Sequence, residues 1–360
     1  MKNHIAVAKA RHSRLSQVDF DHLPFGRVFS DHLFVADYHD GKWERARIEP
    51  FDRFEIHPAS MVLHYGQAIF EGMKASKSED GRPLLFRPDM HAQRFNASAQ
   101  RMCMPDVPES LFLDALHTLI GIDADWIPTQ EESALYIRPF MFANDEFIGV
   151  KPSEHYRFMI FTSPVGPYYA KPVRLRVETQ YVRATQGGTG EAKAAGNYAG
   201  SMLPAKLAQQ AGFDQVMWLD GHEFKYIQEV GTMNIFFVID GTVVTPACDG
   251  AVLKGITRDS ILHLLKDNGY KAEERRLSID EVVEAYDAGV LQEVFGAGTA
   301  AVVSHVSEIA YKDRLLHLPA IEDRKIGEWA KMEINGLRSG RLEDPYGWVV
   351  PVKIPVAESV

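Results

Sequence analysis

A short stretch rich in proline and glycine divides this chain of 360 residues into two parts, each with its own strand-like segments. Residues 156–163 (YRFMIFTS) form a largely apolar run typical of a buried strand, and three prolines and a glycine follow it before residue 173. The next segment, 174–179 (RLRVET), alternates polar and apolar residues as a strand does. Because proline and glycine interrupt regular elements, we predict a small N-terminal α/β domain at 1–165, an interdomain linker at 166–176 and a large C-terminal domain at 177–360.

Strand-like and helix-like segments alternate irregularly along both parts. Residues 234–239 and 242–245 flank an Asp-Gly pair, which is a strong signal for a hairpin. Residues 278–281 (SIDE) form a capping box that opens a helix, and the strand at 293–295 is expected to break at the glycines that follow it. The other predicted helices are 95–103, 110–120, 199–211 and 257–266. This mixture favours an α+β fold over a regular doubly wound sheet.

Charge and cysteine content exclude several classes of protein. Lysine and arginine number 39 against 49 aspartates and glutamates, a net charge of −10 that does not suit a nucleic-acid or anionic-membrane binder. No run approaches the ~18 apolar residues of a membrane span. Two cysteines, Cys103 and Cys248, leave no room for a disulfide framework or a zinc ribbon, which suits a reducing, cytoplasmic setting. None of the 14 histidines has convincing metal-ligand spacing, so no metal is expected.

Four segments combine small residues with a group that could act chemically. Lys193, in KAAGNY, lies on a glycine-flanked loop before a helix, where a desolvated amine could form a Schiff base. Glu229, in QEVGTMN, is one carboxylate in an apolar stretch and needs a partner if it is buried. Residues 254–258 (KGITR) open a helix whose free N–H groups suit a phosphate. Residues 295–300 (FGAGTA) end a strand in small residues that expose backbone N–H groups. Each segment by itself also fits an ordinary structural role.

Pyridoxal 5′-phosphate (PLP) is a cofactor that needs all four kinds of group at once. It requires a lysine for the Schiff base, an acid that keeps the pyridine nitrogen protonated, donors for the phosphate and a hydrogen bond to the ring hydroxyl. The chain has no P-loop, no GxGxxG opening a helix, no HExxH and no GxSxG, which argues against a kinase, a dehydrogenase and a metallohydrolase. The sequence therefore predicts a PLP enzyme.

The ordered set of segments resembles the branched-chain amino acid aminotransferases, class IV enzymes of PLP fold-type IV. The resemblance extends from Phe25 to about Pro351. Its matching segments are HPAS (57–60), LHYGQAIFEGMKA (63–75), LFRPDMHAQRF (85–95), LYIRPF (135–140), KAAGNY (193–198), EVGTMNIFFV (229–238), LKGITR (253–258) and EVFGAGTA (293–300). It implies a two-domain α+β fold similar to D-amino acid aminotransferase, with the cofactor between the domains.

The resemblance also implies a role for individual residues. Toward the cofactor these are Lys193 as the Schiff-base lysine and proton carrier, Tyr198 on the ring hydroxyl, Glu229 on the pyridine nitrogen with Thr232 beside it, and Arg94, Ile256, Thr257 and Thr299 on the phosphate. Toward the substrate they are Thr299 and Ala300 with Tyr65 on the α-carboxylate, and Phe25, Phe70, Tyr136 and Tyr168 around an apolar pocket. Arg138 lies near that pocket, where it either reads a distal carboxylate or forms a structural ion pair.

An enzyme of this family is expected to be a homodimer with its active sites at the interface, and Ile148 and Val150 match the loop that the partner subunit contributes. The implied reaction is ping-pong transamination of L-leucine, L-isoleucine and L-valine with 2-oxoglutarate, which gives branched-chain 2-oxo acids and L-glutamate. No nucleic acid or membrane is an expected partner. Animal members carry a CxxC pair where Ala301 and Ser304 stand, so that form of thiol regulation is not expected, and Cys103 is predicted to be buried.

Three alternatives remain open at this point. A D-amino acid aminotransferase or an aminodeoxychorismate lyase would keep the fold, the lysine and the glutamate, although a match to LHYGQAIFEGMKA and EVGTMNIFFV is not expected of them. A catalytically silent PLP-binding protein is the third. The presence of Lys193, Tyr198, Glu229 and Arg94 together argues against it.

Overall fold

The computed structural model describes residues 4–168 and 171–353, which form two compact units. Unit 1 takes the described parts of Met1–Tyr168, Ala192–Ala195 and Gly336–Val360, and unit 2 takes those of Tyr169–Glu191 and Gly196–Asn335. No helix in the described part of the chain has the length and apolar character needed to cross a membrane.

Two segments belong to unit 1 although the sequence pattern placed them in a C-terminal domain at 177–360. The first carries Lys193, whose backbone carbonyl accepts a hydrogen bond from Phe70 N–H at 3.0 Å. The second includes β18 (Val349–Pro351), which pairs antiparallel with β6 (Pro83–Phe86). Hydrogen bonds between segments so far apart in the chain leave no local signal, so a linear boundary could not include them.

Unit 1 is built on one sheet, which has nine strands among the described residues. Besides β6 and β18, its strands are β1 (Ala6–Val7), β2 (His32–His39), β3 (Lys42–Pro50), β4 (Ala68–Phe70), β5 (Met73–Lys77), β7 (Ala134–Ala143) and β8 (Tyr156–Val165). Their order is β1-β3-β2-β8-β7-β5-β6-β18, with β4 paired to β7. The helices of this unit are α1 (Met61–Tyr65), α2 (Pro88–Arg101) and α3 (Glu109–Ile122).

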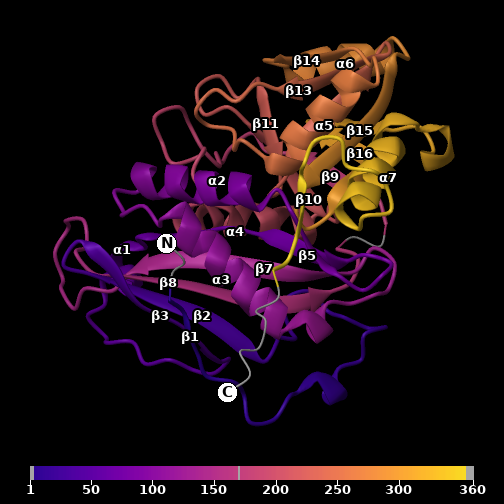
Figure 1. Cartoon of the computed structure of the whole chain (residues 1–360). Helices are drawn as coiled ribbons and strands as arrows, with labels where there is room; N and C mark the ends of the chain where they lie inside the picture. Colours follow the sequence, from indigo (N-terminus) through magenta and orange to yellow (C-terminus); the bar gives the residue numbers. More distant parts are fainter. Residues whose placement is uncertain (1–3, 169–170, 354–360) are drawn as a thin grey trace. The chain divides into compact units, whose positions relative to one another are not determined.

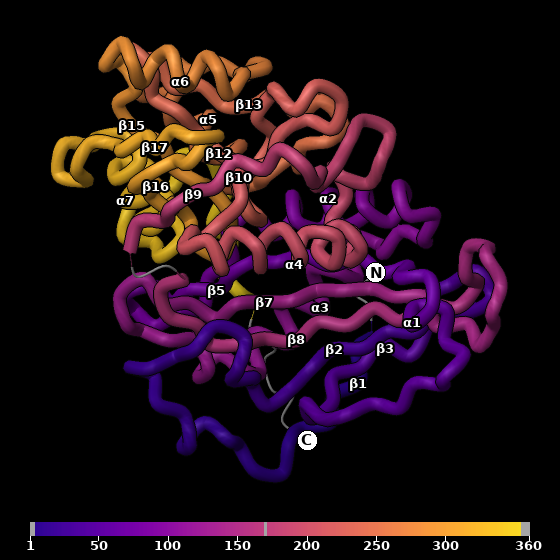
Figure 2. The backbone as a smooth tube through the Cα atoms, turned by 180° about the vertical axis from the view of Figure 1, so that it is seen from behind, coloured from indigo at the N-terminus to yellow at the C-terminus, as the bar shows by residue number. Residues whose placement is uncertain are grey.

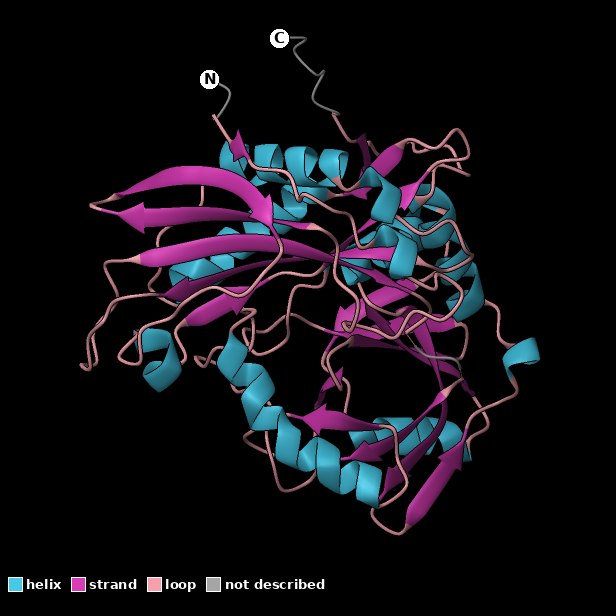
Figure 3. Cartoon of the chain, turned by 90° about the horizontal axis from the view of Figure 1, so that it is seen from below, coloured by secondary structure: helices cyan, strands magenta, loops and turns pink. Residues whose placement is uncertain are grey.

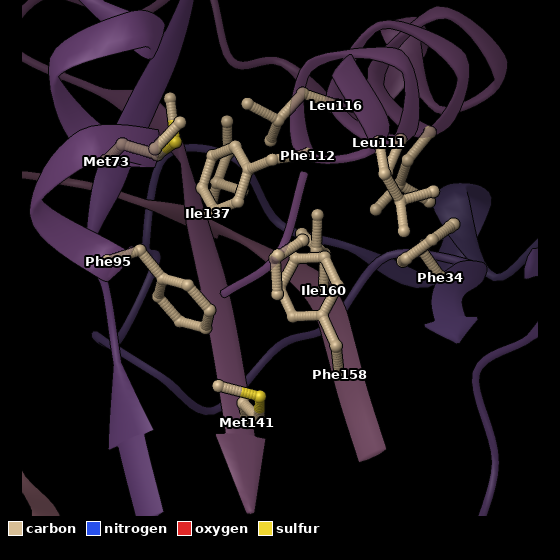
Figure 4. Packing of buried hydrophobic residues seen from close by; sticks show 14 of the residues in the cluster. Phe34, Met73, Phe95, Leu111, Phe112, Leu116, Ile137, Met141, Phe158 and Ile160 are labelled. Atoms are coloured by element: carbon tan, nitrogen blue, oxygen red, sulfur yellow. The ribbon is translucent and has the colours of Figure 1, made fainter. Parts of the chain in front are cut away.

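Helices α2 and α3 cover one face of this sheet and enclose the core of unit 1 (Figure 1). Phe95 of α2, Phe112 of α3 and Phe158 of β8 meet there with ring centres 5.3 to 5.7 Å apart, as Figure 4 shows. Such aromatic pairs add roughly 0.5–1.5 kcal/mol each beyond the burial of their area. Ile137 of β7 also points into this core. Because side chains alternate along a strand, its neighbours Tyr136 and Arg138 lie on the opposite face.

Unit 2 contains a second sheet of nine strands in the described residues. They are β9 (Val173–Val177), β10 (Gln215–Leu219), β11 (Ile227–Val230), β12 (Asn234–Ile239), β13 (Thr242–Pro246), β14 (Ala272–Arg275), β15 (Leu291–Gly298), β16 (Val302–Tyr311) and β17 (Arg314–His317). Their order is β11-β10-β9-β16-β15-β12-β13-β14, with β17 on β16. Figure 2 shows β9 and β10 side by side, where they pair in parallel. The helices α4 (Ala195–Gln210), α5 (Ile256–Asp267), α6 (Ile279–Asp287) and α7 (Ile326–Arg338) complete the chain.

The mixture of helices and strands confirms the α+β class (Figure 3). The hairpin is confirmed, with β12 antiparallel to β13, and so is the capping box, in which Ser278 Oγ accepts a hydrogen bond from Glu281 N–H at 3.0 Å.

The predicted break after 293–295 is wrong, because β15 continues to Gly298. A Cβ atom on Gly296 would lie 2.8 Å from the Met233 side chain. This glycine therefore makes room for a methionine within the strand instead of ending it.

The prediction that Cys103 is buried is also wrong. Helix α2 ends two residues earlier, and Cys103 turns the chain with a φ of 55°, so that its side chain is exposed. It lines a surface hollow together with Tyr38, His155 and Tyr156. Neighbouring methionines suggested burial, but the left-handed turn decides where the thiol points.

Candidate active site

The backbone around Lys193 is fixed to unit 1 on both sides of the residue. Besides the bond from Phe70 to its carbonyl, its own N–H donates to Ser98 Oγ at 3.0 Å, and Ala194 forms an isolated bridge with Ile69. The amine nitrogen Nζ lies 5.0 Å from the centre of the Phe70 ring. The lysine is thus held at its backbone, and its half-buried amine stands against an aromatic surface.

A buried ion cluster follows directly after Phe70. Arg94 donates two hydrogen bonds to Glu71, from Nε to Oε1 at 2.7 Å and from Nη2 to Oε2 at 2.9 Å, and His91 Nδ1 lies 2.8 Å from Oε2. Burial would raise the pKa of the Glu71 carboxyl, but the charge and hydrogen bonds of Arg94, with those of His91, hold it well below its usual range. The paired bonds fix the guanidinium plane of Arg94, the predicted phosphate ligand.

Four aromatic rings and an arginine gather on the face of the unit 1 sheet opposite its core. Phe25 meets the rings of Tyr136 and Tyr168 edge-on, at centroid distances of 5.1 and 4.8 Å. Arg138 Nη2 donates to the Tyr136 hydroxyl at 3.1 Å, and the guanidinium carbon lies 4.6 Å from the centre of the Phe70 ring. Arg138 Nε is buried and has no hydrogen-bond partner among the described residues. The cluster therefore combines aromatic surface with one partly buried guanidinium group.

The predicted acid, Glu229, is buried on β11 of unit 2. Its Oε1 accepts a hydrogen bond from Leu253 N–H at 2.7 Å and lies 3.2 Å from Nη2 of Arg183. The turn that follows places Gly231 at a φ of 53°, and a Cβ atom there would lie 2.2 Å from the amide oxygen of Gln215. Thr232 is exposed in this turn. The acid is therefore held rigidly by a charge and a backbone donor.

The first turn of α5 lies in the same unit as Glu229 and is connected to it through Asn234. Asn234 Nδ2 donates to the carbonyl of Leu253 at 2.9 Å, next to the N–H that meets Glu229. Gly255 caps α5 without a side-chain hydrogen bond, and a Cβ atom on it would lie 1.9 Å from Asn234 Oδ1. Asn234 also pairs with Ala297 near the end of β15. Unit 2 thus brings three predicted cofactor-binding elements together through Asn234 and Leu253. These are Glu229, the N-terminus of α5 with Ile256 and Thr257, and the end of β15.

Tyr198 lies in the first turn of α4, because this helix begins at Ala195, four residues before the predicted start. The loop before it is attached to the helix: Thr189 Oγ1 donates to Asn197 Oδ1 at 2.6 Å, and Asn197 Nδ2 donates to the Thr189 carbonyl at 2.8 Å. Thr299 and Ala300 form the turn between β15 and β16 and are partly accessible. Their binding of the substrate α-carboxylate, which the resemblance implies, stays a prediction.

Comparison with known proteins shows the family of this chain. A family model for "Amino-transferase class IV" matches residues 68–309. The chain is 49% identical over 341 residues to branched-chain-amino-acid aminotransferase 2 of Bacillus subtilis, which covers 93% of each chain. This protein belongs to the branched-chain aminotransferases of class IV. A relative in Mycolicibacterium smegmatis, a branched-chain-amino-acid aminotransferase, is 40% identical over 90% of this chain and 91% of its own.

Solved structures of the family share the fold of this aminotransferase. The branched-chain amino acid aminotransferase of Escherichia coli superposes with a TM-score of 0.74 at 28% identity, over 90% of this chain and 99% of the other. A T.th. branched-chain amino acid aminotransferase, complexed with N-(5′-phosphopyridoxyl)-L-glutamate, superposes with a TM-score of 0.71 at 27% identity, over 88% and 98% of the two chains. The predicted fold-type IV architecture is thereby confirmed, while the position of the cofactor between the domains stays a prediction.

Three predicted site residues of this aminotransferase stand apart from the clusters described above. Ile148 and Val150, in the predicted partner loop, are 67% and 90% exposed. Tyr65 ends α1 and is 40% exposed. Its ring lies beside that of His64, and the described residues show no ring contact between it and Phe25, Tyr136 or Tyr168. In the described residues 4–168 and 171–353, no group of three or more His, Cys, Asp or Glu side chains could hold a metal ion.

Sequence reasoning missed four residues that shape this site: Glu71, His91, Arg183 and Asn234. Glu71 offered a usable signal, because it is a single acid in the apolar run QAIFEGMKA, much as Glu229 is in its own segment. The sequence pattern marks Asn234 only as the first residue of a strand. Arg183 carries no recognisable motif, and its role depends on a contact with a strand more than forty residues later.

Proposed function

We propose that this chain transfers the amino group of L-leucine, L-isoleucine and L-valine to 2-oxoglutarate with PLP as its cofactor. The observation that carries this proposal is the cluster on unit 1 in which the lysine amine and the Arg138 guanidinium both lie against the Phe70 ring. A lysine in that position can serve as the proton carrier, and the rings beside it form a pocket for an aliphatic side chain. The similarity to branched-chain enzymes over more than 90% of the chain supports the choice of substrates.

The residues present fit PLP. Gly255 leaves the first turn of α5 uncapped by any side chain, and a twelve-residue helix offers a strong dipole for a phosphate. Arg94, whose plane is fixed by Glu71, and the hydroxyls of Thr257 and Thr299 are the other proposed phosphate ligands. Glu229 would meet the ring nitrogen and Tyr198 the ring hydroxyl. When bound, PLP supplies an electron sink that stabilises negative charge at the substrate Cα.

Lys193 is the proposed proton carrier. Its Nζ takes the proton from the substrate Cα, and the two hydrogen bonds at its backbone limit the positions that this nitrogen can reach. Thr299 and Ala300 would bind the α-carboxylate and thereby set which face of Cα meets the amine. The result expected from this arrangement is selectivity for one enantiomer of the amino acid.

The side-chain pocket must accept two different groups in the two halves of the reaction. An isobutyl group can lie on the rings of Phe25, Phe70 and Tyr136, because it needs no hydrogen-bond donor. The carboxyethyl group of glutamate needs a donor, because a buried and unpaired carboxylate costs several kcal/mol. Arg138 fits that need, since its guanidinium lies against the Phe70 ring beside the Tyr136 hydroxyl, and no ion pair among the described residues includes it. We therefore assign it to the distal carboxylate and not to a structural ion pair.

A homodimer forms part of the proposal. Phe147, Ile148 and Val150 are exposed together on one loop, and large apolar side chains gathered in this way mark an interaction surface. A second copy of the chain would cover them and bring Ile148 and Val150 to the site, as the resemblance implies. Sedimentation of the purified protein tests this part directly.

The deciding experiment is a panel of L-amino acids with 2-oxoglutarate, with D-leucine as the matched control. We expect turnover with L-leucine, L-isoleucine and L-valine and none with the D-enantiomer. Turnover of D-leucine alone would identify a D-amino acid aminotransferase. Binding of PLP without turnover of any amino acid would identify a silent PLP-binding protein.

A further inference from the structure

Arg183 is a buried arginine that meets the predicted acid. Its side chain is 9% exposed, and Nη2 lies 3.2 Å from Oε1 of Glu229, which is 4% exposed. The same nitrogen donates to the carbonyl of Ala251 and lies 3.5 Å from that of Gly190. Its Nε is buried without a hydrogen-bond partner in the described residues. The Arg183 guanidinium therefore contacts Glu229 on β11 and the backbone of two other segments. These are the segment before α5 and the loop that leads to Lys193.

Burying this arginine requires compensation. Removing a charged group from water costs several kcal/mol unless a counter-charge and hydrogen bonds replace the solvent. Glu229 is the only ion-pair partner that the described residues give to Arg183. A guanidinium cannot be deprotonated in a protein, so its charge favours the ionised form of a nearby carboxylate at every working pH.

We propose that Arg183 is the positioning residue of this enzyme's acid: it keeps Glu229 ionised and fixes its orientation, so that the proton stays on the cofactor's ring nitrogen. This inference rests on the role proposed above for Glu229. Arg183 and the N–H of Leu253 both meet Oε1, which fixes the rotation of the carboxylate. Through the Ala251 carbonyl the same arginine also ties the acid to the segment that leads into α5.

Gly190 is the residue that allows this contact. A Cβ atom there would lie 2.3 Å from the carbonyl oxygen of Ala251 and 2.4 Å from the Cβ of Ala184. Any side chain at this position must therefore shift the backbone of Ala251, to which Arg183 donates, or the segment that carries Ala184. We expect Gly190→Ala to weaken the contact between Arg183 and Glu229 although the sequence keeps both charged residues.

The test uses the holoenzyme loaded with PLP that carries ¹⁵N in its ring. The variants are Arg183→Gln, Arg183→Lys, Glu229→Gln and the double variant, with Arg176→Gln, an exposed arginine of β9, as the matched control. The measurements are the ¹⁵N chemical shift of the ring, which reports its protonation, together with kcat, KM and the melting temperature. Gly190→Ala is measured in the same way.

For Arg183→Gln we expect the ring shift to move toward the unprotonated value and kcat to fall roughly ten- to hundred-fold, as is typical when the partner behind a functional group is removed. Arg183→Lys should retain most of the ring protonation, and Arg176→Gln should match the wild type. In the Glu229→Gln background, Arg183→Gln should cause little further loss, because Arg183 acts through that carboxylate.

A wild-type ring shift in Arg183→Gln, with only a lower melting temperature, would overturn the inference and leave Arg183 a purely structural residue. Fully additive losses in the double variant would overturn it as well. If instead Glu229→Gln itself retained ring protonation and turnover, the proposed role of Glu229 would fail. The two failures are thus separate results.

Discussion

Lys193 and Phe70 are joined twice, once through the backbone and once through their side chains. Phe70 N–H donates to the lysine carbonyl at 3.0 Å, and the lysine amine lies 5.0 Å from the centre of the phenylalanine ring. The backbone hydrogen bond fixes the position of the lysine main chain, and the ring limits the positions that its amine can occupy. A flexible side chain is thereby confined on the face that also carries Arg138.

The first prediction concerns the lysine itself. Lys193→Ala is expected to abolish transamination, because it removes the amine that lies against the Phe70 ring and is proposed to carry the proton. Lys206→Ala, which removes an exposed lysine of α4, is the matched control and should retain activity. Borohydride reduction followed by peptide mapping should place the cofactor on Lys193. Its recovery on any other lysine would remove this assignment.

The second prediction concerns the two substrates that share one pocket. Arg138→Gln should raise KM for glutamate and 2-oxoglutarate by roughly ten- to hundred-fold. This corresponds to the free energy of one or two hydrogen bonds to a charged group. KM for leucine should change much less, because its side chain needs no donor. Steady-state kinetics with both substrates provide the measurement. An equal change for leucine and glutamate would show that Arg138 serves only the structure.

The third prediction concerns the α5 N-terminus. Gly255→Ala should weaken PLP binding, because the new Cβ would lie 1.9 Å from Asn234 Oδ1 and would displace the first turn of the helix. Gly200→Ala is the control: its Cβ would meet nothing within 4 Å in α4, so affinity should be unchanged. Fluorescence titration of the apoenzyme with PLP measures both. Equal affinities in the two variants would contradict the proposed phosphate site.

The fourth prediction concerns acid stability. Asp220 accepts four backbone hydrogen bonds at 2.7 to 3.1 Å, and although burial acts against them, they lower its pKa from 3.8 to about 2. A lowered folded-state pKa stabilises the fold above pH 3.8, and this contribution is lost as pH falls toward 2. Asp220→Ala should therefore cost about 1 kcal/mol at neutral pH, after allowance for solvent screening.

Denaturant unfolding of the wild type and Asp220→Ala across acidic pH tests this prediction. The difference between the two unfolding free energies should be constant near neutrality and should shrink below pH 3.8. A difference that widens in acid would have the wrong sign for a stabilising carboxylate.

The fifth prediction concerns the two thiols. Burial raises the pKa of Cys248, so little of it is the reactive thiolate, whereas Cys103 is exposed. A disulfide reagent should therefore show one fast and one slow phase, with leucine transamination largely retained after the fast one. Cys103→Ser should abolish the fast phase. Persistence of that phase in the variant would assign it to Cys248.

Local chemistry explains which parts of the fold the sequence could predict. The hairpin at 234–245 depends on an Asp-Gly turn, and the start of α6 depends on the capping pair Ser278 and Glu281, so both signals lie within a few residues. The motif segments likewise indicate Lys193 and Glu229 from their immediate neighbours in the chain.

Long-range contacts explain the rest. No pattern in the chain shows that Glu71 pairs with Arg94, because the bond requires β4 and α2 to fold together. Taken alone, Gly296 predicts the end of a strand. The side chain for which it makes room, that of Met233, belongs to another segment of the chain. Arg183 lies in a loop without a recognisable pattern, and only the folded unit shows which carboxylate it meets.

The strand β18 has a consequence for how the protein is made. Its pairing with β6 means that unit 1, which begins near the N-terminus, receives its last strand from the end of the chain, after all of unit 2 has been synthesised. Domains generally fold as units while the chain emerges from the ribosome. The unit whose synthesis starts first is therefore the one whose assembly finishes last.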